Sequence, residues 1–78
     1  MKEYLTTLIE EKGKFIDDEI QIDGQIGLTY EMLFDFIEEM PQYHKTIRDT
    51  LVKIDFKNGD IFHYLKYLAE GMIKSLGY

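Results

Sequence analysis

Apolar residues recur at helical spacing in four stretches of this 78-residue chain. Hydrophobic positions that follow one another by three or four residues form one face of an α-helix. The pattern therefore predicts helices over about residues 2–12, 29–39, 42–56 and 60–76. In the second helix the predicted core stripe comprises Met32, Leu33, Phe36, Ile37 and Met40, flanked by Tyr30 and Phe34.

The ends of these helices carry signals of their own. Gly13 follows the first helix, where a left-handed backbone conformation is commonly required. Thr29 is the predicted N-cap of the second helix, because its hydroxyl can accept a hydrogen bond from a first-turn N–H group. Pro41 ends that helix and can open the third, and Asp60 is the predicted cap of the fourth.

Residues 14–28 change to a period of two, which is typical of a half-buried extended segment. The apolar residues of this segment are all even-numbered: Ile16, Ile20, Ile22, Ile26 and Leu28. Asp23-Gly24 favours a hairpin, and a three-residue loop would pair Ile22 with Ile26 on the same face as Ile20 and Leu28. We predict that hairpin, or else a single extended arm that crosses the helices.

Residues 50–57 allow a second interpretation, since apolar and polar positions alternate there and Asn58-Gly59 is a strong hairpin dipeptide. A strand would shorten the fourth helix and leave Leu51 off the buried face, so we favour a helix. The predicted fold is mainly α, a compact bundle of about four helices with a short extended arm or β-hairpin between the first two. Residues 1–78 form a single domain. The alternative is an α+β fold with a second hairpin around Asn58-Gly59.

Acidic residues are concentrated in the first half of the chain. Residues 1–40 hold eleven acids and three lysines, a net charge of −8, whereas residues 41–78 hold four acids and six bases, a net charge of +2. On the second predicted helix, four acids form a candidate partner-binding face: Glu31, Asp35, Glu38 and Glu39. Direct binding of nucleic acid requires a basic footprint, so we do not expect it. The acidic face could instead imitate a row of phosphates.

The composition excludes several other classes of protein. Cysteine is absent, which removes disulfides, and no Cys/His cluster offers a zinc site. Asp17 to Gly24 is similar to part of a calcium loop, but Tyr30 stands where such a loop needs its last acid. No apolar run approaches the ~20 residues that cross a bilayer. We expect a cytoplasmic protein with no cofactor, no metal and no membrane contact.

Catalytic signatures are equally lacking. His44 and His63 fall on polar arcs of their predicted helices, and Ser75 is the only serine. No nucleophile motif and no glycine-rich phosphate loop occurs. We therefore expect that the protein is not an enzyme.

Six tyrosines and five phenylalanines exceed what one small core requires. On the fourth predicted helix, Tyr64 and Tyr67 fall beside the core stripe, next to Gly71. Tyrosine is favoured at protein interfaces, and a glycine allows a neighbouring backbone to approach. We expect a small acidic protein-binding or regulatory module that self-associates as a homodimer through these three residues or docks on a protein partner. The alternative is an acidic, nucleic-acid-mimicking inhibitor of a nucleic-acid-binding protein.

Overall fold

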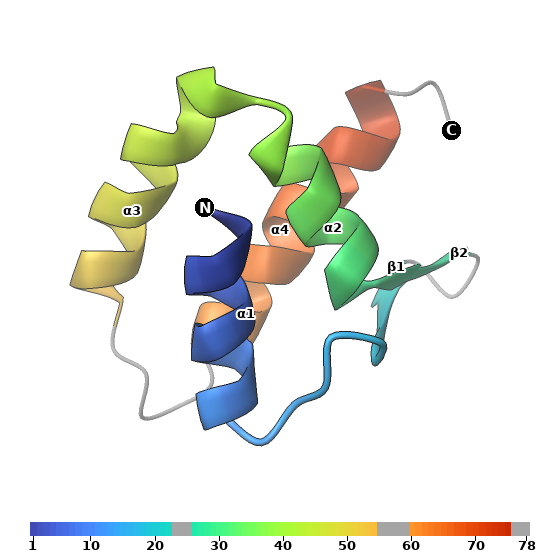
Figure 1. Cartoon of the computed structure of the whole chain (residues 1–78). Coiled ribbons are helices and arrows are strands. Elements are labelled where there is room, and N and C mark those ends of the chain that lie inside the picture. The colour runs from blue at the N-terminus through green and yellow to red at the C-terminus, as the bar shows by residue number, and fades with distance from the viewer. Residues whose placement is uncertain (23–25, 55–59, 76–78) are drawn as a thin grey trace.

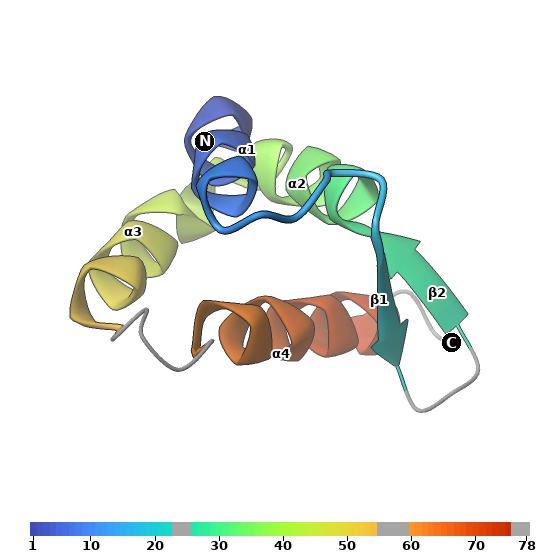
Figure 2. The ribbon, with the colours of Figure 1, turned by 90° about the horizontal axis from the view of Figure 1, so that it is seen from below.

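The computed structural model describes residues 1–22, 26–54 and 60–75. The elements of this part of the chain, in order, are α1 (Lys2–Glu11), β1 (Glu19–Ile22), β2 (Ile26–Thr29), α2 (Tyr30–Glu38), the short 3-10 helix η1 (Pro41–Tyr43), α3 (His44–Lys53) and α4 (Asp60–Ser75). Figure 1 shows α4 behind α1 and α2, and Figure 2 shows α1, α2 and α3 on one side with α4 on the other. The hairpin lies beside the start of α2, and β1 contacts α4. The predicted, mainly helical fold with a hairpin between the first two helices is confirmed.

Strands β1 and β2 pair in the register that the three-residue loop predicts. Ile20 lies opposite Leu28, and Ile22 lies opposite Ile26. Ile20 and Leu28 are both buried, because this face of the hairpin packs on the helices. The alternative of a single extended arm is therefore wrong. Residues 23–25, including Asp23-Gly24, lie outside the described residues.

Two local signals at helix ends are confirmed. Gly13 has a φ of +81°, the left-handed conformation that ends α1. The Thr29 hydroxyl accepts a hydrogen bond from the Met32 N–H at 3.1 Å and so caps α2. Two further N–H groups at the start of α2, those of Tyr30 and Glu31, donate to carbonyl oxygens in the segment that joins α1 to β1. The start of α2 is thus held by the chain that precedes it.

The third predicted helix is shorter than expected. Residues 41–43 form a separate 3-10 turn, and α3 ends at Lys53, after which Ile54 is extended with φ −74° and ψ 134°. Thr50 lies inside α3, so the first strand of the alternative second hairpin does not form there. Asn58-Gly59 lies outside the described residues. Asp60 is the first residue of α4, in its first turn, rather than a residue ahead of the helix.

Each α-helix and each strand supplies at least one residue to a single hydrophobic core, whereas η1 has no buried residue. Among the residues whose burial the structure describes, thirteen are buried: Leu5, Ile9, Ile20, Leu28, Tyr30, Leu33, Phe34, Ile37, Ile47, Leu51, Ile61, Leu65 and Ala69. The predicted core stripe of α2 is displaced, since Met32 is 46% exposed and Phe36 and Met40 are only half-buried. The buried arc consists instead of Tyr30, Leu33, Phe34 and Ile37, which follow the i, i+3, i+4, i+7 spacing.

The cap of α2 gives a first prediction. We expect Thr29→Ala to lower the free energy of unfolding by about 1 kcal/mol, because the Met32 N–H loses its acceptor. Thr7→Ala is the matched control, since Thr7 is an exposed residue within α1 and alanine is the better helix former. Urea denaturation of both variants measures the difference. Equal stability of the two variants would contradict the role of the cap.

Candidate functional site

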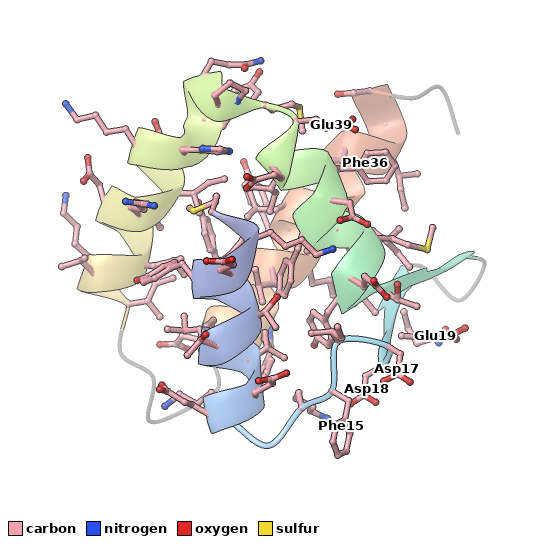
Figure 3. All side chains as sticks on the ribbon, viewed as in Figure 1. Phe15, Asp17, Asp18, Glu19, Phe36 and Glu39 are labelled. Atoms are coloured by element: carbon pink, nitrogen blue, oxygen red, sulfur yellow. The ribbon has the colours of Figure 1, made fainter. Side chains whose placement is uncertain are left out.

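The three predicted interface residues line one groove on the surface. Tyr64, Tyr67 and Gly71 form part of its α4 wall, and α2, η1 and α3 provide the opposite wall. We call this feature the α4 groove; it has a volume of about 640 Å³ and is lined by thirteen described residues. Figure 3 shows Phe36, from α2, projecting over the C-terminal half of α4. The three residues predicted to lie together on one helix thus line one side of a groove, and residues of α2, η1 and α3 line the other side.

Large aromatic rings remain exposed around the α4 groove. The side chain of Tyr67 is 70% exposed and that of Tyr43, in η1, is 53% exposed. Tyr64, Phe36 and Met40 are half-buried, so each shows part of its apolar surface to solvent. Aromatic residues and methionine are enriched at protein interfaces relative to the remaining surface. Exposed and half-buried aromatic and methionine side chains are therefore concentrated around the groove.

Gly71 leaves the middle of the α4 wall open. Apart from Gly71 itself, its two chain neighbours and the adjacent α4 backbone, no described atom lies within 4 Å of the position that a β-carbon would occupy at this residue. The Ser75 hydroxyl donates to the Gly71 carbonyl oxygen at 3.0 Å, which is a bond within the helix. A backbone from another molecule could therefore approach α4 closely at Gly71 without meeting a side chain of that residue.

The two histidines lie in different surroundings. His44 is half-buried, and its Nε2 lies 2.7 Å from the carbonyl oxygen of Ile37. Because a carbonyl oxygen only accepts, Nε2 is the protonated nitrogen and donates to the end of α2. His63 is exposed on α4 and does not line the α4 groove. The histidine at position 44 therefore has a structural role, joining α2 to α3.

The predicted acidic face contacts the start of α1. Lys2 Nζ lies 2.6 Å from the nearest carboxylate oxygen of Asp35 and 3.9 Å from that of Glu31. Glu38 accepts a hydrogen bond from the Lys2 backbone N–H at 2.9 Å and lies 3.1 Å from the Met1 ammonium group. Since α1 has no cap from its own side chains, Glu38 supplies one from α2, next to the positive end of the helix dipole.

The pKa values of this cluster follow from the same contacts. The hydrogen bond from the Lys2 backbone and the Met1 ammonium group lower the pKa of Glu38 below its ordinary value of 4.5. The hydrogen bond to Asp35, opposed by desolvation and aided by the charges of Asp35, Glu31 and Glu38, raises the pKa of Lys2 above 10.5. Both shifts favour the charged forms, as expected for groups that attract one another.

Glu39 is separate from the other three acids. Figure 3 shows its side chain at the end of α2, on the same side as Phe36. The structure therefore divides the predicted acidic face into three carboxylates that contact the start of the chain and one, Glu39, that is exposed and for which no such contact is seen.

Some exposed residues were not among those predicted to form a site. Phe36, Met40 and Tyr43 line the α4 groove. Their spacing of four and three residues is the one sequence feature that indicates a shared face. Phe15 is 71% exposed and lies beside Asp17, Asp18 and Glu19 in the segment that leads into β1, as Figure 3 shows.

Within residues 1–22, 26–54 and 60–75, no three His, Asp or Glu side chains are grouped so that they could hold a metal ion. None of the helices described is long and apolar enough to cross a membrane. Comparisons of the chain with protein-family models, with curated proteins and with solved structures found no match.

The contacts of Glu38 predict how stability depends on pH. A carboxylate whose pKa is lowered by folding stabilises the fold above its unfolded pKa, and that contribution is lost as the pH falls through the folded value. We therefore expect stability to decrease as the pH falls below about 4.5. Glu38→Gln should be less stable than the wild type at pH 7 and should lose less stability on acidification.

Glu39→Gln is the control for this prediction, because it removes the neighbouring carboxylate, for which no contact with Met1 or Lys2 is seen. It should follow the pH dependence of the wild type. Urea denaturation between pH 3 and pH 7 measures all three proteins. If Glu38→Gln and Glu39→Gln lose stability in parallel, Glu38 does not cap α1.

Proposed function

We propose that this chain is a non-catalytic, small acidic protein-binding or regulatory module that self-associates or docks on a protein partner through the α4 groove. The observation that carries the proposal is the arrangement of exposed Tyr67 and Tyr43 around the open backbone of Gly71. A surface of aromatic rings beside a glycine offers apolar area and close backbone contact at one place.

The size of the chain supports self-association. A domain of this length buries only roughly 60% of the surface that its unfolded chain exposes, so its stability margin is small. Cysteine is absent, and small domains without disulfides often gain stability from a second subunit. A twofold dimer is the commonest soluble oligomer and would place two copies of the groove against each other. We therefore propose a homodimer at micromolar concentration.

We also propose that the protein is cytoplasmic, needs no cofactor and does not bind nucleic acid directly. These three expectations rest on its amino-acid composition. The alternative of an acidic inhibitor of a nucleic-acid-binding protein has weaker support. Three of its four carboxylates, Glu31, Asp35 and Glu38, contact cationic groups of α1. A basic partner would have to compete with Lys2 and the Met1 ammonium group for them.

Gly71→Arg tests the groove as a binding surface. The arginine should fit the isolated chain, because the space around Gly71 is open and arginine is a better helix former than glycine. In an association through the groove, its guanidinium would be brought against apolar rings at a large desolvation cost. We expect a folded monomer, with the dissociation constant raised at least about a hundredfold, or about 2.7 kcal/mol.

The matched control is His63→Arg, which adds an arginine to an exposed position of α4 outside the groove. Sedimentation equilibrium of the wild type and both variants up to several hundred micromolar decides the matter, with circular dichroism to verify folding. His63→Arg should dimerise like the wild type. A wild type that stays monomeric, or a Gly71→Arg dimer, would refute self-association through this surface.

A further inference from the structure

The α4 groove contains two charged side chains of opposite sign. Glu70, which is half-buried, and Lys74, which is exposed, both line it. They are four residues apart on α4, and this spacing corresponds to about 6 Å along the helix axis. Within the described part of the chain, neither residue forms an ion pair. Both charges are therefore available to a molecule that occupies the groove.

When two copies of the chain bring their α4 helices together, Glu70 and Lys74 face opposite charges only if the two helices are antiparallel. If two α4 helices lie antiparallel and cross at the level of Met72, Glu70 of each copy stands level with Lys74 of the other. Two opposite-charge contacts then form, related by the twofold axis. If the helices were parallel, Glu70 would face Glu70 and Lys74 would face Lys74, and like charges would repel.

The open backbone lies at the same level. Gly71 is adjacent to Met72, the midpoint between the two charged residues, so the helices can approach most closely where the antiparallel arrangement makes them cross. Tyr67 lies one turn before Gly71 and is 70% exposed, so its ring remains available to contact the other copy.

We infer that the occupant of the α4 groove is a second copy of this chain, with the two α4 helices antiparallel and Glu70 of each paired with Lys74 of the other. This inference rests on the proposed function and deepens it by naming the partner and its orientation. The ion pairs fix the register of the two helices, and the aromatic rings supply the apolar contact area.

Charge reversal tests the inference. In the Glu70→Lys dimer, the new lysine of each copy faces Lys74 of the other copy. In the Lys74→Glu dimer, the new glutamate of each copy faces Glu70 of the other copy. Each single variant should raise the dimer dissociation constant by about tenfold, because two attractions become repulsions. The double variant Glu70→Lys/Lys74→Glu exchanges the charges and should return to within about twofold of the wild type. A mixture of the two single variants should form a heterodimer, since all its contacts are of opposite charge.

Lys66→Glu is the matched control, because it makes the same change of charge on α4 at an exposed position outside the groove. It should dimerise like the wild type. Sedimentation equilibrium at low salt measures all the variants, and the differences between them should shrink at 1 M salt, where charges are screened within about 3 Å.

The outcomes distinguish this inference from the proposed function. If Gly71→Arg disrupts the dimer but neither single charge reversal weakens it, or the double variant fails to restore it, the antiparallel pairing is wrong and the groove remains the binding surface. A wild type that is monomeric at several hundred micromolar overturns both the inference and the proposed self-association. The groove would then be left to a different protein.

Discussion

Burial of helix α2 is the constraint on which the remaining structure depends. This nine-residue helix supplies four of the thirteen buried hydrophobic residues, and its buried side chains belong to the same cluster as those of α1, α3, α4 and the hairpin. A helix in this position must satisfy its terminal polar groups without abundant water. The Thr29 hydroxyl and two carbonyl groups of the preceding segment hold its first turn, and His44 donates to the Ile37 carbonyl oxygen near its end. The surrounding elements are therefore held to α2 by hydrogen bonds as well as by packing.

The same helix also holds the start of the chain. Glu38 caps α1, and Lys2 lies against Asp35, so residues more than thirty positions apart form one polar cluster. These groups are exposed, and individual exposed ion pairs contribute little to stability. Their effect is on position, because they fix the start of α1 beside the end of α2. The acidity of α2, which suggests a surface for a partner when the sequence is considered alone, is thus partly used within the molecule.

The strands and the helix ends could be predicted because the residues that determine them are close together in the sequence. The period of two in residues 14–28 and the need to place Ile20 and Leu28 on one face were sufficient to give the strand register. Gly13 and Thr29 act through the backbone of their own turn. The role of Glu38 could not be predicted in this way, because it depends on where α1 lies in space. The buried arc of α2 was misjudged for a related reason: nearly every non-acidic residue of this helix is apolar, and only the packing selects among two possible faces.

Those two apolar faces explain why a groove exists. The arc with Phe34 and Ile37 packs into the core, whereas Phe36 and Met40 lie on a second arc that is only half-buried. Helix α4 covers part of that second arc, but the C-terminal half of α4 carries Gly71, which has no side chain to fill the space. The composition of α2 and the glycine of α4 thus create the same surface from opposite sides.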